Sequence, residues 1–289
     1  MKKGLLICNS FWQSASMSAM EARFLHAAQR LDVSLSVRGN GDFLPLFPSA
    51  PAAFFPGGTP DFVLFWDKDT RLCRYMEGLG VSVFNSSTAI TLCDDKTLTH
   101  LALHGFPVPP TVLCPLTFPG NGYGDFSFLD RAAEAVGYPM VIKEGCGSLG
   151  QQVYLARDRR EAADILQRIG GATALMQRFV RESAGRDKRL YMVDGQCAAA
   201  IERRNSADFR ANIAAGGSAM PYRPTEAEVR LARDCCDRLG LVFAGVDLLD
   251  GSDGTLVCEV NSNAHFTALE QATGADIAGA ILSAVRRRL

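Results

Sequence analysis

The sequence lacks the features that mark disulfide-rich, zinc-binding and membrane-spanning proteins. Its nine cysteines are scattered, odd in number and form no CxxC pair, which favours reduced thiols in a cytoplasm. The four histidines are not spaced with them as zinc ligands are. The apolar run after Met1 stops at Asn9, too short for a signal-peptide core or a transmembrane span. We expect the first buried strand at 4–8 instead.

An excess of charge is also absent. The chain has 30 basic and 31 acidic side chains, a net charge of -1, so no global field recruits nucleic acid or an anionic membrane, and we expect neither as a partner. Its 289 residues, 47% of them hydrophobic, suit a soluble globular protein with one elaborated domain or two to three small ones. No internal repeat or low-complexity tail is present.

The common nucleotide-binding motifs are missing as well. The glycine-rich segment 145–150 lies between two strand-like runs, and its backbone N–H groups can form an anion-binding nest. No Gly-Lys-Ser/Thr follows it, which excludes a Walker A loop, and the next segment has a strand pattern, which excludes a Rossmann fingerprint. Lys143 adds a cation at the end of the preceding strand. Alone, a glycine-rich hairpin loop and a strand-end lysine are weak evidence.

Strands alternate with helices over the first part of the chain, which predicts a small doubly wound α/β domain at 1–86. An α+β lobe is expected at 87–180 and a second lobe at 181–289. The predicted strands are 4–8, 33–37, 61–66, 81–84, 111–114, 140–143, 152–156, 172–180, 189–193, 196–202, 245–249 and 256–261. The predicted helices are 18–29, 70–79, 87–104, 126–136, 159–169, 226–239 and 275–288.

Three oxygen-bearing side chains lie on the last two predicted strands. The turn composition of 251–254 predicts a hairpin that brings Asp247 beside Glu259. Glu259 and Asn261 are two residues apart and therefore share one face of their strand. Carboxylate and amide oxygens suit Mg²⁺, which often bridges to nucleotide phosphates. Taken alone, such a set is more often a group of polar side chains on the surface of a hairpin.

Together, the lysine, the glycine-rich segment and the oxygen donors resemble the ATP-grasp superfamily, and within it the RimK-type α-L-glutamate ligases. The matching segments follow one order over about half of the chain: 143–150, 176–180, 185–189, 200–204, 208–212, 216–217, 244–247, 259–261 and 273–279. Segment 94–96, followed by 105–109, is also similar to the family. The resemblance implies an ATP-grasp fold after the N-terminal domain.

The resemblance also implies ATP and Mg²⁺ as cofactors, with two ions and with Mn²⁺ as an alternative metal. The ATP contacts that it implies are Lys96, Lys143, Gly147, Ser148, Gln177, Arg178, Phe179, Val180, Asp187, Arg210 and Asn212, with the backbone of 177–180 reading adenine. The implied metal ligands are Asp247, Glu259 and Asn261. Arg210 and Lys143 would neutralise charge on the transferred phosphate; Arg189 is a third candidate, or else an ordinary strand residue.

The activity implied is an ATP-dependent carboxylate–amine ligase that works through an acyl phosphate, with an amino acid, a peptide or a protein tail as acceptor and a homo-oligomer as its assembly. A small-molecule kinase and a non-catalytic nucleotide-binding regulator are the alternatives. The family has a small-Ser-Pro-Gly turn where this chain has 262–266, which puts glutamate as the added residue in doubt. His265 there is either a base for the amine or a packing residue. Segments 11–12 and 66–69 are candidates for substrate contact.

Overall fold

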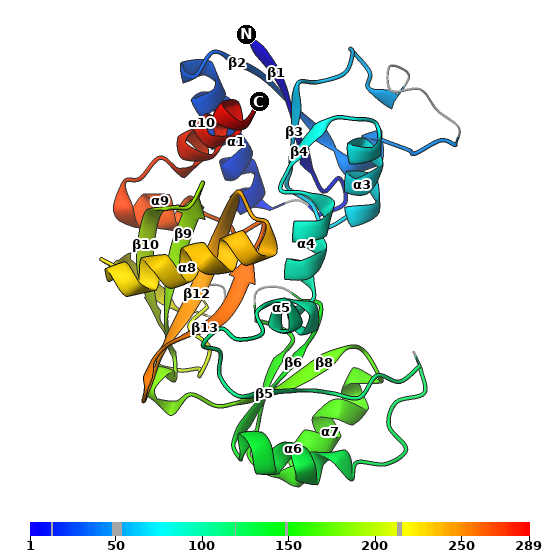
Figure 1. Cartoon of the computed structure of the whole chain (residues 1–289), viewed down its shortest axis with the longest axis vertical. Coiled ribbons are helices and arrows are strands. Elements are labelled where there is room, and N and C mark those ends of the chain that lie inside the picture. The colour runs from blue at the N-terminus through cyan, green and yellow to red at the C-terminus, as the bar shows by residue number, and fades with distance from the viewer. Residues whose placement is uncertain (13, 48–53, 119, 148–149, 213–215) are drawn as a thin grey trace.

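A four-stranded parallel sheet forms the first part of the computed structural model, which describes residues 1–12, 14–47, 54–118, 120–147, 150–212 and 216–289 (Figure 1). Its order is β2-β1-β3-β4. The strands are β1 (Lys2–Cys8), β2 (Val33–Gly39), β3 (Phe62–Phe65) and β4 (Ser82–Phe84). Helix α1 (Ala15–Arg30) packs against one face and α3 (Thr70–Gly78) against the other. The doubly wound α/β arrangement expected here is confirmed.

The second part is an antiparallel sheet with two helices on one face. Its order is β5-β8-β6-β7, from β5 (Thr111–Leu113), β6 (Met140–Glu144), β7 (Val153–Ala156) and β8 (Ala174–Arg178). Helices α6 (Phe128–Val136) and α7 (Arg159–Ile169) bury one face of it. Because neighbouring residues of a strand point to opposite faces, Lys143 and Gln177 lie on the face away from these helices.

The single helix predicted over 87–104 is wrong. The structure has α4 (Ser87–Asp94) and α5 (Lys96–Ala102), because Asp95 is extended (φ -106°, ψ 111°) and its side chain caps α5, accepting a hydrogen bond from the Thr97 N–H at 2.8 Å. The Lys96 N–H at the break donates to the Gly145 carbonyl at 2.9 Å. The break therefore fixes the start of α5 against the glycine-rich segment.

The third part is a five-stranded antiparallel sheet of order β11-β10-β9-β12-β13. Its strands are β9 (Arg186–Val193), β10 (Gln196–Arg204), β11 (Ser218–Pro221), β12 (Phe243–Gly251) and β13 (Gly254–Asn261). Helix α8 (Glu226–Leu239) covers one face. Helices α9 (Thr267–Thr273) and α10 (Ile277–Arg288) follow. The short 3₁₀ turn η1 (Asn40–Asp42) comes after β2, and a second one, η2 (Arg181–Ser183), comes before β9. The predicted β12–β13 hairpin is confirmed, whereas β11 and α9 were not predicted.

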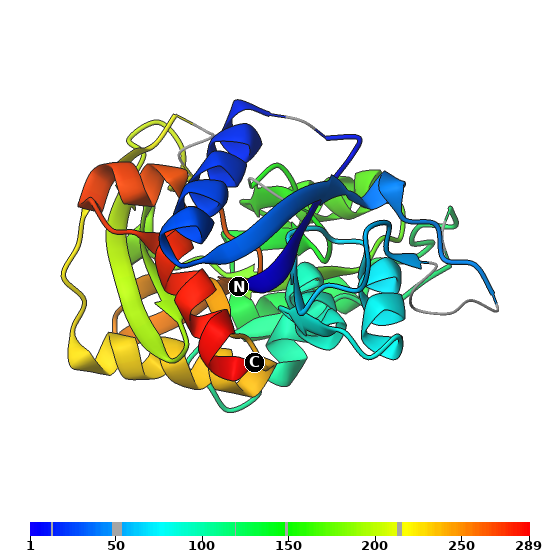
Figure 2. The same cartoon turned by 90° about the horizontal axis from the view of Figure 1, so that it is seen from above.

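The first and third sheets share one hydrophobic core. Trp66, just after β3, stacks on Phe243 of β12 with ring centroids 5.3 Å apart, and Phe24 and Phe266 pack around it. Figure 2 shows α1 beside α10 in the same region. This core holds the carboxyl end of β3 against the third sheet.

We propose that the three parts of the chain are divided near residues 86 and 180. Among the described residues, no helix is long and apolar enough to cross a membrane.

Candidate functional site

Two buried lysines lie where the second sheet meets the third. Lys96, at the start of α5, is 8% exposed, and its Nζ lies 3.6 Å from Glu259 Oε1 on β13 and 3.4 Å from the Gly147 carbonyl oxygen. Lys143 of β6 is 7% exposed, and its Nζ lies 3.7 Å from the Sγ of Cys258, beside Glu259. Two ammonium groups from one lobe thus face the hairpin of the other. This arrangement suits a polyanion bound between the lobes.

A histidine that the sequence analysis did not single out supports this lysine pair. His100 Nδ1 lies 2.8 Å from the Lys96 carbonyl oxygen, which can only accept, so Nδ1 carries the proton and Nε2 accepts from Gln177 Nε2 at 3.0 Å. Burial, followed by the charge of Lys143, lowers the pKa of His100 to about 4. The ring is therefore neutral near pH 7, and with Thr111 it engages the Gln177 side chain.

The three residues after Gln177 differ in their exposure and in their contacts. Arg178 is exposed, its side chain donates to the Ala135 carbonyl at 3.2 Å, and its backbone N–H donates to the Pro110 carbonyl at 2.9 Å. The backbone N–H of Arg178 is thus already bonded, and its guanidinium is directed to the end of α6. Phe179 packs edge-on against Phe209, with ring centroids 6.2 Å apart. Phe179 and Val180 are half-buried at the start of the third part.

The glycine-rich segment touches the connection between β10 and β11. Arg210 donates to the Gly150 carbonyl at 2.6 Å and forms a bidentate pair with Asp208. Gly150 has φ +74°, and a Cβ there would lie 3.2 Å from Nδ2 of Asn212. Glycine is needed at this position for its left-handed backbone and for the close approach of Asn212. Ser148 lies outside the described residues.

Four charged residues, three of them buried and Arg189 half-buried, form a chain across β9, β10 and β12. Arg203 donates to both carboxylate oxygens of Asp187 at 2.6 Å and to Asp247 Oδ2 at 2.8 Å. Arg189 binds Asp247 through two bonds of 2.7 Å. Arg189 is therefore an ion-pair partner of a predicted metal ligand and no ordinary exposed strand residue. The role of Arg203 is not predicted from the sequence, because no local pattern shows which carboxylates its side chain reaches.

The surroundings of Asp247 keep it ionised. Burial opposes its charge, but Arg189 and Arg203 outweigh the burial and lower its pKa. A carboxylate offers about four acceptor positions, and the two guanidinium groups use three of those on Asp247. Asp247 is thus left with room for about one more partner.

The predicted metal ligands share one face of the hairpin. Asp247 is directly opposite Glu259, and Gly245 is opposite Asn261. Nδ2 of Asn261 is buried without a hydrogen-bond partner among the described residues. Within the same residues no three His, Cys, Asp or Glu side chains converge as a metal cluster, which agrees with a set of only two carboxylates and an amide. The donors fit Mg²⁺, provided that the ion shares Asp247 with the guanidinium groups.

The residues that follow β13 lie in two different environments. Phe266 is fully buried against Phe24 and Trp66, so it is a core residue. The His265 ring meets Trp12 edge-on, with centroids 6.0 Å apart, and its Nδ1 lies 3.3 Å from Ser16 Oγ. Burial, and then the charge of Arg189, lowers the pKa of His265.

The first of the two aromatic candidates near the start of the chain does not join this contact: Phe11 is 85% exposed, whereas Trp12 is 49% exposed and touches His265. Trp12 and His265 therefore remain candidates for substrate contact. Trp66 is buried in the shared core, and the charged residues that follow it lie at the carboxyl end of β3.

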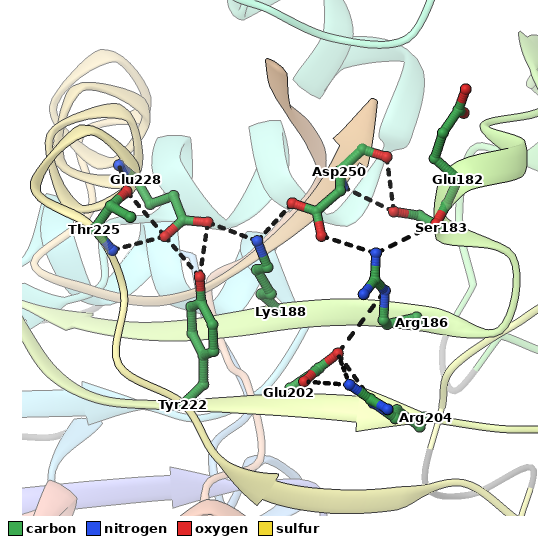
Figure 3. Close-up of polar contacts among 10 residues, drawn as sticks. All are labelled: Glu182, Ser183, Arg186, Lys188, Glu202, Arg204, Tyr222, Thr225, Glu228 and Asp250. Atoms are coloured by element: carbon green, nitrogen blue, oxygen red, sulfur yellow. Dashed lines mark hydrogen bonds and ion pairs between the residues drawn. The ribbon is translucent and has the colours of Figure 1, made fainter. Parts of the chain in front are cut away.

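The opposite face of the third sheet carries a second polar network, under the N-terminus of α8 (Figure 3). Lys188 donates to Glu228 and Asp250, and Glu228 also accepts from Tyr222 and from the Thr225 backbone and side chain. Burial disfavours the Lys188 ammonium, but these carboxylates outweigh it and raise its pKa. Because its charges satisfy one another, we interpret this network as structural support for the sheet.

The chain is similar in sequence and in fold to known proteins. The RimK-like ATP-grasp domain family matches residues 120–285. "Beta-citrylglutamate synthase B" of Danio rerio is 36% identical over 220 residues, which cover 74% of this chain and 53% of that protein, so the chain spans about half of its length. A "probable alpha-L-glutamate ligase" of Thioalkalivibrio sulfidiphilus is 34% identical over 223 residues, covering 75% of this chain and 71% of that protein. A RimK-domain ATP-grasp protein of Sphaerobacter thermophilus has the same fold, with a TM-score of 0.72 at 23% identity over 97% of this chain and 98% of that one.

Proposed function

Because the chain belongs to the RimK-like ATP-grasp family, we propose that it joins a carboxylate to an amine in an ATP-dependent reaction that passes through an acyl phosphate. The observation that carries this proposal is the convergence of Lys96 and Lys143 on the hairpin that bears Glu259. The named relatives are ligases and synthases, which favours ligation over the alternative of a kinase or a regulatory protein.

The chemistry matches this set of residues. A carboxylate is a poor electrophile, and transfer of the γ-phosphate to it creates a leaving group that an amine displaces. The protein must hold the reactants in line and neutralise charge on the transferred group. We propose that Lys96, Lys143 and Arg210 provide cationic contacts to the phosphates. Arg189, which is hydrogen-bonded to Asp247, would add positive charge to the same site.

The remaining ligand contacts are proposed from the same geometry. Adenine would be read by the backbone of 179–180, since the Arg178 N–H is already bonded. Gly147 and Asn212 would lie beside the phosphates. Glu259, Asn261 and Asp247 would hold two Mg²⁺ ions, or Mn²⁺ in their place. Such an ion would neutralise phosphate charge when bound.

We also propose a cytoplasmic location and a homo-oligomer. The nine cysteines are all free, and burial is the main cause that raises the pKa of several of their thiols, including Cys73 and Cys114. Unreactive, unpaired thiols are typical of a reducing compartment.

The ligase and the kinase differ in what hydroxylamine traps. With Mg-ATP, a panel of amino acids and short carboxylic acids, and hydroxylamine, the ligase is expected to form acyl hydroxamates, because hydroxylamine attacks an acyl phosphate. Hydroxamates are measured by mass spectrometry together with released ADP. ADP release that yields only a stable phosphate ester would contradict the ligase and support the kinase.

Lys143→Ala is expected to weaken ATP binding by about tenfold to a hundredfold, since a charge-assisted hydrogen bond contributes about 1.5–3 kcal/mol. The measurement is the thermal stabilisation of the protein by increasing ATP concentrations. Lys2→Ala, which changes an exposed lysine of β1, is the control and should respond like the wild type. Equal stabilisation of Lys143→Ala and wild type would remove Lys143 from the phosphate site.

A further inference from the structure

A buried carboxylate at the carboxyl end of β3 has an unused oxygen. Asp67 is 5% exposed, and its Oδ1 accepts the Asp69 N–H at 2.8 Å. Its Oδ2 is buried and has no hydrogen-bond partner in the part of the chain that the structure describes. The neighbouring Lys68 forms its ion pair with Asp94. Over the described ranges of the chain, no ion pair of Asp67 with a lysine, arginine or histidine is present.

This state is costly to the free protein. Taking an ionised carboxylate out of water without a counter-charge is unfavourable, so buried charges are almost always paired. A ligand that brings a positive charge to Asp67 would remove that cost when it binds. A buried acid without a partner is for this reason a stronger indication of a binding site than an exposed one.

A second unpartnered acceptor belongs to Asn263, which is hydrogen-bonded to Asp67. Asn263 Nδ2 donates to the backbone carbonyl of Asp67 at 3.0 Å, which leaves Asn263 Oδ1 as an acceptor, and this oxygen is also buried without a partner among the described residues. Two hydrogen-bonded residues that each have an oxygen acceptor without a donor call for a ligand rich in N–H groups. A primary ammonium has three N–H donors and no acceptor, and it carries the missing charge.

The position of these oxygens connects them to the candidate site. Asn263 follows Asn261 by two residues, and the intervening Ser262 carbonyl accepts from Asn85 Nδ2 at 3.0 Å, which fixes the segment against the first sheet. On the other side, Asp94 is the ion-pair partner of Lys68 and precedes Lys96 by two residues. A ligand at Asp67 would thus lie next to the end of the hairpin that bears Glu259.

We propose that Asp67 and Asn263 bind the ammonium group of an amino-acid substrate. This inference rests on the proposed function, since it assigns a substrate class to the same site. The ammonium belongs either to the acceptor amine or to the amino group of the acid that is activated, and both use the same contacts.

Asp67→Asn tests the proposal, because it removes the charge and keeps an acceptor for the Asp69 N–H. The probe is an equimolar mixture of the twenty L-amino acids. We expect the mixture to raise the melting temperature of the wild type and not that of Asp67→Asn. In Asp67→Asn we also expect at least a tenfold rise in the concentration of the amino-acid mixture that gives half-maximal ADP release, with the KM for ATP unchanged. Asp61→Asn, at the exposed amino end of the same strand, is the matched control and should behave like the wild type.

The ligand-free melting temperature separates a binding role from a structural one. Without ligand, Asp67→Asn is expected to melt at the wild-type temperature or above it, because it loses an unpaired buried charge. A lower melting temperature would show that Asp67 has a structural partner and would overturn the proposal. An Asp67→Asn response to the amino acids equal to that of the wild type, or no response in the wild type, would also overturn it.

Chemical variants of the probe identify the source of the ammonium. The same mixture after N-acetylation keeps its carboxylates and is expected to give no stabilisation; equal stabilisation would contradict the proposal. Glycinamide and alaninamide have an ammonium group and no carboxylate, so they can act only as the amine. ADP release from a mixture of one of these amides and an N-acetylated amino acid therefore assigns the bound ammonium to the acceptor. Release that requires a free amino group on the acid assigns it to the acid. Amino-acid binding at Asp67 without any ligation would refute the proposed function and leave this site intact.

Discussion

Glu259→Gln is expected to lower kcat for ATP turnover by about a thousandfold or more, equivalent to about 4 kcal/mol of transition-state stabilisation. The substitution keeps the size of the side chain and removes the charge that would hold Mg²⁺ at the phosphates, where a metal contributes several kcal/mol. It also removes the partner of Lys96, 3.6 Å away. The measurement is steady-state ADP release at saturating Mg-ATP.

The fold should survive this change. The Glu259 side chain is 30% exposed and its ion pair is long, so the unfolding free energy is expected to change by less than about 1 kcal/mol. Asp253→Asn, in the exposed turn of the same hairpin, is the control and should retain wild-type turnover. Wild-type turnover in Glu259→Gln would refute its role as a metal ligand.

Asp247→Asn is a less clean test of the same site. Asp247 is 3% exposed and lies between Arg189 and Arg203. Its neutralisation would leave these two guanidinium groups, of which that of Arg203 is buried, with less compensation, so lost turnover would be mixed with lost stability. Glu259 is therefore the better position at which to separate the metal from the fold.

Arg203→Ala is expected to destabilise the protein by about 3–5 kcal/mol, because removing one partner of a buried ion pair leaves an uncompensated charge. Arg203 is 4% exposed and is bonded to both Asp187 and Asp247. For a chain of this size the change corresponds to a fall in Tm of about 10 °C. Thermal and urea unfolding, each followed by circular dichroism, measure it.

The adjacent residue provides the matched control. Arg204 has a side chain that is 54% exposed and pairs with Glu202 at 3.0 Å, so Arg204→Ala should cost less than about 1 kcal/mol. Arg203→Lys keeps the charge but loses the bidentate geometry, and we expect an intermediate loss. Equal destabilisation of Arg203→Ala and Arg204→Ala would show that the buried chain of charges does not stabilise the fold.

Local periodicity accounts for much of the fold. The alternation of strands and helices predicts the first sheet, and the apolar runs around 251–254 predict the hairpin with Glu259 opposite Asp247. These features depend on residues near one another in sequence, and therefore the sequence is enough to find them. The break at Asp95 was missed because a capping aspartate inside a helical pattern resembles a surface position until its bond to Thr97 is seen.

The order of the family segments and the lysine, glycine and oxygen-donor residues of the candidate site were determined by the sequence alone. Only the tertiary structure decided how distant residues pair: Arg203 between Asp187 and Asp247, His100 on Gln177, and Asn263 on Asp67, 196 residues away in sequence. The physical reason is that side-chain ion pairs and hydrogen bonds depend on which strands become neighbours in space. No local pattern records that choice, and it is made by the shared core that places β3 against the third sheet.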